Sequence, residues 1–212
     1  MVEKTTIAAV KKALDSSPKR NFRQSVDLAI NLRDVDLSIP KNRIQEDIVL
    51  PHGRGKALRI CVIGGAELAA KAKDLADLVI TPEELGKIAD DRKQAKKVAS
   101  QVDYFIAEAP LMPQIGKRLG IVLAPRGKMP KPIPPGADPT PMIEALRKTV
   151  SVRTKDRKTF QASVGTVDMT PEELAENVDA ILKRVTSKLE KGKMNIDSAY
   201  VKTTMGPAEK VL

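Results

Sequence analysis

The residue types that could bind phosphate gather just before position 60. LPHGRGKALRI, residues 50–60, contains two glycines and Lys56, as phosphate-binding loops do. Such a loop also needs a longer spacing, a Ser or Thr after the lysine, and a following helix whose amides face the phosphate. Here Ala57 follows the lysine, and we expect a strand next. We interpret the segment as a hinge or crossover between domains, with Arg54 and Lys56 available for a basic surface.

Catalytic groups are sparse elsewhere. IGGAEL, residues 63–68, stands where a dinucleotide-binding fold places G-x-G-x-x-G, but only two of those glycines are present. His52 is the single histidine, and many carboxylates lie in first turns of expected helices, where the helix dipole favours them without catalysis. Cys61, the one cysteine, excludes an internal disulfide and a four-cysteine zinc site. The sequence predicts no enzyme activity, no catalytic residue, no metal and no cofactor; a nucleotide-binding α/β enzyme is the competing hypothesis.

A second basic segment, LAPRGKMPKP, spans residues 123–132. It joins Arg126, Lys128 and Lys131 to a rigid proline frame. We expect the overlapping IVLAP to be a parallel strand, and ligands usually lie beyond the carboxyl ends of such strands. The three cations therefore either bind a ligand or belong to an ordinary loop. The competing enzyme would bind its nucleotide here or at IGGAEL.

Two segments far apart in the sequence belong to expected strands. NFRQS begins the first of these strands, and DSAYVKTTMG forms most of the last one and the turn after it. If these strands lie side by side, they bring together one ring, one thioether, several hydroxyls and a glycine, with few charges. Hydroxyls and a glycine backbone can approach 2′-OH groups and phosphates closely, while the apolar groups pack on sugars and bases. The pattern predicts an RNA-binding site, with an ordinary sheet edge as the alternative. The predicted site consists of Phe22, Ser25, Ser198, Thr204, Met205 and Gly206.

Two kinds of sheet are needed to position these segments. Over residues 21–32 apolar and polar side chains alternate, as in a half-buried strand of an antiparallel sheet, and an amphipathic helix is expected before it over residues 5–14. From residue 58, LRICVIGG is apolar on both faces apart from Arg59, and strands then alternate with helices. The expected fold class is α/β with two domains: a split α+β domain with an antiparallel sheet and helices on one face, and an inserted three-layer, Rossmann-like α/β domain.

The first pattern returns after residue 150. A helix is expected over residues 142–150, and short strands, a capped helix over 170–189 and a final strand over 195–205 follow it. Neither the strands before residue 58 nor those after 150 make a stable sheet alone, so we pair them around an insertion. We expect 1–57 and 152–212 to form the split RNA-binding domain and 58–151 the inserted domain, with AEKVL, residues 208–212, as a loose tail.

The overall charge favours a polyanionic partner. The chain of 212 residues carries 37 Lys and Arg against 27 Asp and Glu, a net charge of +10. Such a balance suits nucleic acid. No apolar run approaches the roughly 18 residues that a membrane span requires. We therefore expect a cytoplasmic chain with no membrane partner.

Four motifs in sequence order resemble the ribosomal protein L-one family. They are LPHGRGK, LAPRGKMPKP, VGT before a long helix, and TTMGP. The early end after TTMGP, and Ala124 where bacterial members usually have glycine, resemble the archaeal branch. The resemblance places the family's RNA-contacting cluster on the six residues of the predicted site, with Ser25 where some relatives have threonine. It also assigns Arg126, Lys128 and Lys131 to the family's second signature, as secondary RNA contacts.

The same resemblance implies a function. Members are structural constituents of the large ribosomal subunit, where the split domain binds large-subunit ribosomal RNA and forms the mobile stalk beside the tRNA exit site. The inserted domain moves relative to it, and the stalk assists release of deacylated exit-site tRNA. Members also commonly repress translation by binding their own messenger RNA. The resemblance thus implies a monomer when free of the ribosome, and a cytoplasmic, ribosomal location.

Overall fold

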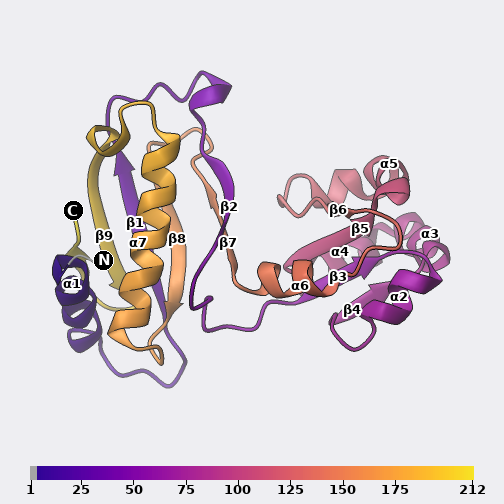
Figure 1. Cartoon of the computed structure of the whole chain (residues 1–212), viewed down its shortest axis with the longest axis horizontal. Coiled ribbons are helices and arrows are strands. Elements are labelled where there is room, and N and C mark those ends of the chain that lie inside the picture. Colours follow the sequence, from indigo (N-terminus) through magenta and orange to yellow (C-terminus); the bar gives the residue numbers. More distant parts are fainter. Residues whose placement is uncertain (1–3) are drawn as a thin grey trace. The chain divides into compact units, whose positions relative to one another are not determined.

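The computed structural model describes residues 4–212, which fall into two compact units. The described residues up to Lys56 and the stretch Lys148–Leu212 form unit 1. Ala57–Arg147 form unit 2, so unit 2 is inserted between two distant parts of the sequence that fold together (Figure 1). Within the described residues, no helix has the length and apolar character needed to cross a membrane.

Unit 1 is organised around an antiparallel sheet in the strand order β10–β9–β1–β8. In β1, Ser25–Leu32, buried and half-buried residues alternate strictly, which confirms the alternation expected from the sequence. β1 pairs with β9, Ile196–Thr203, on one side and with β8, Thr159–Thr166, on the other. β10, Ala208–Lys210, extends the sheet beyond β9. The two central strands therefore come from the two ends of the chain.

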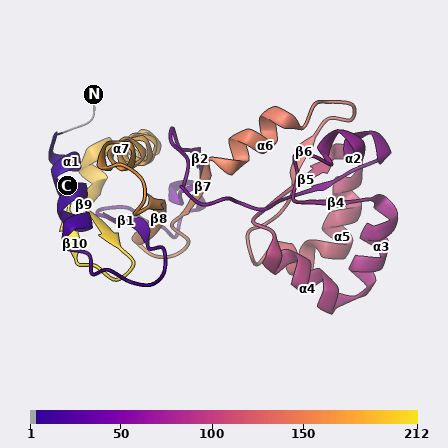
Figure 2. The same cartoon turned by 90° about the horizontal axis from the view of Figure 1, so that it is seen from below.

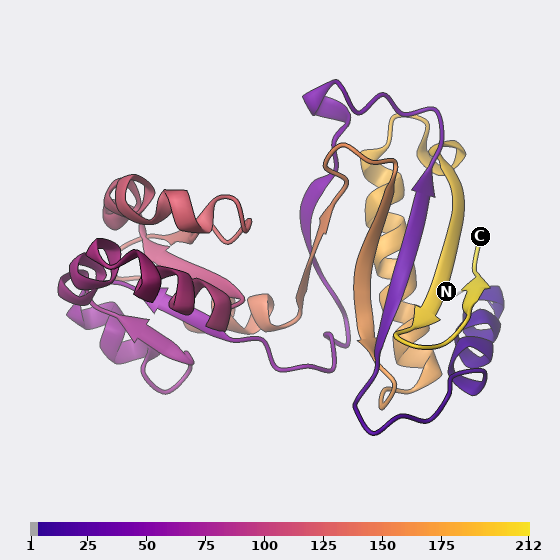
Figure 3. The same ribbon diagram turned by 180° about the vertical axis from the view of Figure 1, so that it is seen from behind.

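Helices cover one face of this sheet and leave the other open. α1, Lys4–Asp15, and α7, Pro171–Lys188, pack on the apolar face with the main core of the unit. Figure 1 shows α7 in front of the sheet, whereas from behind, in Figure 3, the strands β8, β1 and β9 lie in front of it. α7 begins at a capping box, because the Thr170 hydroxyl accepts from the Glu173 amide and the Glu173 carboxylate accepts from the Thr170 amide.

A second, two-stranded antiparallel ribbon lies where the chain leaves and re-enters unit 1. It consists of β2, Gln45–Val49, and β7, Thr149–Arg153. Helix α6 of unit 2 ends at Arg147, so the helix expected over 142–150 is too long at its end. Two short 3-10 turns, η1 (Pro40–Asn42) and η3 (Gly192–Asn195), lie in other loops of unit 1.

The loop after β2 is tied to α7 by one buried amide. The side chain of Asn177 donates to the carbonyls of Gly53, at 2.9 Å, and Val164, at 3.0 Å, and it accepts from the His52 amide at 3.2 Å. Gly53 and Gly55 have φ values of +68° and +65°, which favour glycine. The glycines of LPHGRGK therefore make a crossover turn and do not form a phosphate loop.

Unit 2 has three layers built on a parallel sheet in the order β4–β3–β5–β6 (Figure 2). α2 and α6 pack on one face, while α3, α4 and α5 pack on the other. All four residues of β3 are buried, which confirms the strand expected to be covered on both faces. The whole chain is thus a mixed α/β fold with antiparallel and parallel sheets. The elements of unit 2 are β3 Ile60–Ile63, α2 Ala66–Ala72, β4 Leu78–Ile80, α3 Pro82–Asp90, α4 Arg92–Gln101, β5 Tyr104–Glu108, η2 Ala109–Leu111, α5 Met112–Leu123, β6 Lys131–Ile133 and α6 Thr140–Arg147.

The prediction of a strand at IVLAP is wrong, because helix α5 continues to Leu123. Ile115, Leu119 and Leu123 are buried at four-residue spacing, whereas Ile121 is 69% exposed. That is the period of a helix, and a short apolar run alone does not distinguish it from a strand. LAPRGKMPKP consequently follows a helix and leads into β6.

The loose tail expected at AEKVL is also wrong. Ala208–Lys210 form β10, which pairs with β9, and Val211 packs against the core of unit 1. Glu209 adds an ion pair to Lys12 of α1 at 2.8 Å. The chain end is therefore held by backbone, apolar and charged contacts together.

Candidate nucleic-acid interface

Five of the six predicted site residues lie at one end of the β1–β9 pair. The Thr204 amide donates to the Ser25 carbonyl at 3.0 Å. The Thr204 hydroxyl is also within hydrogen-bond distance of the Ser25 amide, at 3.1 Å, and of its carbonyl, at 3.2 Å. These bonds carry the strand pairing one residue beyond β9. We call the five residues Phe22, Ser25, Thr204, Met205 and Gly206 the turn site.

Gln24 is the centre of the hydrogen bonds that shape the turn site. Its buried side chain accepts from the Met205 amide at 3.1 Å and donates to the Pro18 carbonyl at 2.8 Å and to Ser17 Oγ at 3.2 Å. Ser17 also accepts from the Thr203 hydroxyl at 2.9 Å. One amide side chain therefore joins the loop before β1 to the turn after β9. The sequence analysis missed this residue, because a lone glutamine outside a periodic pattern gives no signal.

Gly206 is required by space at this turn. A Cβ at this position would come too close to the Thr203 hydroxyl and would lie 3.5 Å from Ser17 Cα. Those are the groups that hold the turn to the loop before β1. The glycine therefore lets the backbone of the turn pack closely on Thr203 and Ser17.

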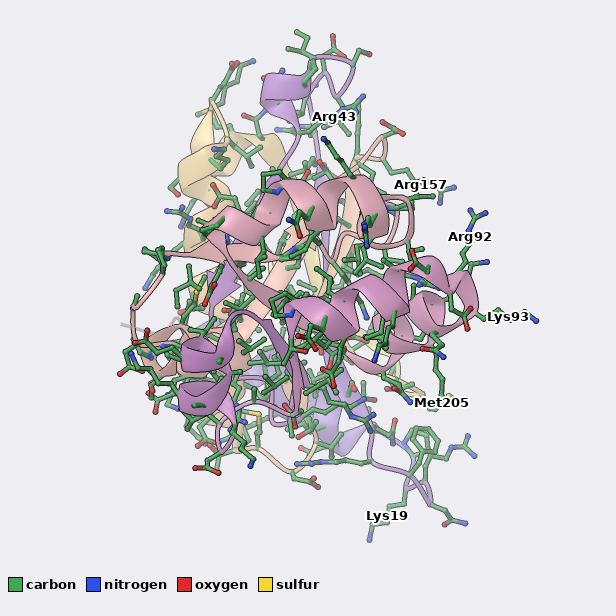
Figure 4. All side chains as sticks on the ribbon, turned by 90° about the vertical axis from the view of Figure 1, so that its right-hand side faces the viewer. Lys19, Arg43, Arg92, Lys93, Arg157 and Met205 are labelled. Carbon is green, nitrogen blue, oxygen red and sulfur yellow. The ribbon has the colours of Figure 1, made fainter. Side chains whose placement is uncertain are left out.

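The apolar side chains of the turn site face solvent. Phe22 is 52% exposed and Met205 is 51% exposed. Phe22 lies before the start of β1, so it is not on the strand as the parity of the sequence suggested. Arg23 beside it is paired with Asp168, while Lys19 is exposed and projects away from the ribbon in the lower part of Figure 4, which also labels Met205. The site thus offers a ring and a thioether next to hydroxyls and backbone, with cations at its margin.

Ser198 is not part of this cluster. It pairs with Asn31 in the sheet, and its hydroxyl accepts from the Asn31 side chain at 2.9 Å. Six residues of strand separate it from Thr204, or about 20 Å at the usual rise of a β-strand. Ser198 does lie on the open face of the sheet. Its cross-strand partner, Asn31, and the residue two positions along β9, Tyr200, point to the same face.

The open face also carries groups that the sequence analysis did not select. Burial raises the pKa of Asp27, and a hydrogen bond with Ser163 and the charges of Arg54 and Lys202 partly offset this. Within residues 4–212, two buried side-chain polar atoms have no hydrogen-bond partner, Arg54 Nε and Thr166 Oγ1. Thr166 pairs with Ser25. The strand alternation of β1 would have placed Asp27 on this face, but the position of Arg54 depends on the crossover loop.

The three cations of LAPRGKMPKP belong to unit 2, so they do not form part of the turn site. Lys128 Nζ donates to the carbonyls of Ala99, at 3.0 Å, and Val102, at 2.5 Å, at the end of α4. Arg126 approaches the Lys96 carbonyl at 3.5 Å, and Lys131 lies 5.7 Å from the centre of the Tyr104 ring. Lys128 therefore stabilises a helix end, which the basic pattern alone could not indicate.

The other candidate sites have structural explanations. The Gly65 amide at the start of α2 donates to the Glu108 carboxylate at 3.1 Å, which puts a negative charge where IGGAEL would have to hold phosphate. His52 Nε2 contacts the Glu176 carboxylate at 2.5 Å. Burial raises the pKa of Cys61 to about 12, so this thiol is not reactive. No group of three or more potential metal ligands occurs in the described part of the chain.

Comparison with known proteins identifies one family. The family model described as "Ribosomal protein L1p/L10e family" matches residues 10–207. A "Large ribosomal subunit protein uL1" from the archaeon Methanocella arvoryzae is 58% identical over 100% of both chains. Proteins with the same name from Thermoplasma volcanium and Haloferax volcanii are 52% identical, over 96% of this chain and 94% of theirs, and 51% identical, over 98% of both.

Proposed function

The chain belongs to the Ribosomal protein L1p/L10e family, and on this premise we propose that it is an archaeal-type protein of the large ribosomal subunit that binds large-subunit ribosomal RNA through the turn site. The observation that carries the proposal is the exposure of Met205, in the turn after β9, and of Phe22, in the loop before β1, beside polar groups that are already hydrogen-bonded. A preformed surface of this kind loses little conformational freedom on binding.

The chemistry of the turn site suits folded RNA better than a DNA duplex. Phe22 and Met205 can pack on unstacked bases or sugars, and the hydroxyls of Ser25 and Thr204 with the Gly206 backbone can meet 2′-OH groups at close range. The open face extends from the turn site towards Ser198, but Ser198 itself is buried, at 7% exposure, and its hydroxyl is bonded to Asn31. Thr166, which pairs with Ser25, and Arg54, whose charge acts on Asp27, each add a buried polar atom that has no hydrogen-bond partner among the described residues.

The wider role follows from family membership and remains part of the proposal. The two compact units act as domains, in which unit 1 is fixed to ribosomal RNA and unit 2 moves about the crossovers near residues 56 and 148. Together with the RNA they form the mobile stalk and assist release of deacylated tRNA from the exit site. The free protein is a monomer in the cytoplasm that also binds and represses its own messenger RNA.

Filter binding to a stalk fragment of large-subunit ribosomal RNA tests the RNA site. Met205→Asp places a charge at the centre of the contact, and we expect it to cost about 2 kcal/mol of binding free energy, roughly 30-fold in Kd. Met194→Asp is the matched control, because Met194 is 74% exposed in η3. Equal affinity of the Met205 variant and the wild type, or wild-type affinity no better than for random RNA, would contradict the proposal.

We propose no enzymatic activity. The competing nucleotide-binding enzyme would need a phosphate at the start of α2, where the Glu108 carboxylate already lies 3.1 Å from the Gly65 amide. Calorimetry with a panel of nucleotides should give no heat of binding, and saturable binding of any nucleotide with turnover would reverse this conclusion.

A further inference from the structure

Helix α4 of unit 2 has an unbalanced charge. Its sequence, RKQAKKVASQ, contains four basic residues and no acidic one. The Asp91 side chain caps the helix by accepting from the amides of Lys93, at 2.8 Å, and Gln94, at 3.4 Å. Ala95 and Ala99 are buried against the unit 2 core, which fixes the rotation of the helix about its axis. All four basic residues are exposed, and the helical period places Lys93 and Lys97 farthest from the buried alanines, with Lys96 at the flank.

Lys96 and Lys97 are both neighbours of Lys93 on the helix surface, because they follow it by three and four residues. All three are exposed. Figure 4 shows Lys93, and Arg92 beside it, projecting away from the ribbon. Arg126 reaches the same surface from the loop after α5, with its guanidinium 3.5 Å from the Lys96 carbonyl. We call Lys93, Lys96, Lys97 and Arg126 the basic strip.

The charges of the basic strip are not neutralised within the described residues. No carboxylate of residues 4–212 forms an ion pair, at 4.0 Å or less, with any of its four cations. Elsewhere in unit 2, Lys71 of α2 contacts Glu67 at 2.8 Å. Four close, unpaired cations repel each other, and a polyanion relieves that repulsion.

We propose that the basic strip is a second RNA-binding surface, which holds the phosphate backbone of a double-helical RNA segment without reading its sequence. The proposal rests on the proposed function and adds a contact separate from the turn site. Single-stranded RNA would require aromatic stacking platforms, and α4 has no aromatic residue. A protein partner would be expected to meet a charge-depleted, aromatic-rich centre, which the strip lacks. Phosphate groups along a duplex match a row of exposed cations.

The test uses the full-length protein saturated with the stalk ribosomal RNA fragment. Binding of a labelled RNA duplex of unrelated sequence is measured by fluorescence anisotropy over a series of salt concentrations. Lys93→Gln with Lys97→Gln removes two charges from the strip. Lys71→Gln with Lys73→Gln is the matched control, because both lysines are exposed and α2 packs on the other face of the sheet.

We expect the strip variant to bind the duplex about tenfold more weakly and to reduce the slope of log Kd against log salt by about 2, one for each lost phosphate contact. The control variant should change both quantities by less than half as much. Affinity for the ribosomal RNA fragment should stay the same in both variants, which separates this surface from the turn site.

Equal effects of the two variants on duplex binding would contradict the proposal that the basic strip binds RNA. So would a wild-type complex that does not bind the duplex at all. Loss of binding to poly-glutamate with unchanged duplex binding would assign the strip to an acidic protein and reject the RNA partner. Failure of the wild type to bind the ribosomal RNA fragment would instead reject the proposed function.

Discussion

The two family signatures, TTMGP in unit 1 and LAPRGKMPKP in unit 2, use their side chains in opposite ways. In TTMGP the polar groups bond inward, to Ser25 and Gln24, and the apolar Met205 is left in solvent. In LAPRGKMPKP the charged Lys128 bonds inward, to the end of α4, and Arg126 is left beside exposed lysines. The first surface is uncharged and held in one shape by its hydrogen bonds, whereas the second is a group of exposed cations.

This difference teaches where affinity and specificity should come from. Neutral contacts on a rigid turn depend on shape and on desolvation, so they should vary little with salt and strongly with the RNA fold. Contacts from exposed cations should vary strongly with salt and little with sequence. Each of the following substitutions breaks one side of the comparison or sharpens it.

Gln24→Leu should have the largest effect. It removes three hydrogen bonds that join the two loops of the turn site, and it leaves the Met205 amide without its partner. We expect unfolding in urea to show a loss of about 3 kcal/mol, and affinity for the ribosomal RNA fragment to fall more than tenfold at a temperature where the variant is folded. Gln24→Glu keeps an acceptor for the Met205 amide but loses the two donated hydrogen bonds. Its stability should therefore be lower than that of the wild type. Full RNA affinity in the Leu variant would mean that the turn needs no such support.

Lys128→Met should come second, and its effect should be on stability alone. The change keeps the aliphatic stem but removes the charged bonds to the Ala99 and Val102 carbonyls, which we expect to cost unit 2 about 2 kcal/mol. Lys117→Met, at an exposed position of α5, is the control. Thermal unfolding and filter binding measure the two properties. Unchanged stability with weaker binding to ribosomal RNA would make Lys128 an RNA contact.

Gly206→Ala should cost about 1–2 kcal/mol, because the added methyl group meets the Thr203 hydroxyl and Ser17. RNA affinity should fall with it, since the turn backbone must shift. Gly116→Ala in α5 is a matched control, because no atom lies within 4 Å of its new Cβ. In a helix that change should stabilise unit 2 by up to about 1 kcal/mol. Calorimetric unfolding of both variants would show whether the two glycines differ in sign.

Asp27→Asn should have the smallest effect, and it should depend on pH. Burial raises the pKa of Asp27 above its ordinary value of 3.8, so the folded state binds the proton more tightly than the unfolded state does. The ionised group therefore costs stability above its folded pKa, and the cost disappears as the pH falls below 3.8. The Asn variant should be slightly more stable than the wild type at pH 7 in urea unfolding. A gain that persisted unchanged below pH 3.8 would show that charge is not its cause.

Periodicity made the regular parts of this fold predictable. Alternation gave the strand that became Ser25–Leu32, and an apolar run on both faces gave Ile60–Ile63. It was less useful for IVL, because three apolar residues fit either a strand or the end of α5, and only the burial of Leu119 and Leu123 decides for the helix. Local pattern therefore identifies an element where only one period fits the run, and it fails where a short apolar run fits both periods.

The turn site was predictable in part, for a different reason. Thr204, Met205 and Gly206 stand at the end of an expected strand, where the pattern of hydroxyls, thioether and glycine selected them and the resemblance to a family agreed. Gln24 and Arg54 could not be selected in this way, since their positions depend on contacts across 181 residues of sequence or on a crossover loop. Ser198 shows the converse, because strand rise alone places it about 20 Å from Thr204.

Strand β10 has a consequence for the behaviour of the protein in concentrated solution. Without it, the eight-residue strand β9 would present a long row of free amides and carbonyls at the sheet edge, which is a template for pairing with another chain. β10 covers the part of that edge from Tyr200 to Lys202 with a strand of only three residues, two of which, Glu209 and Lys210, carry charge. This short, charged strand therefore shortens the free edge and reduces edge-to-edge pairing between copies of the protein.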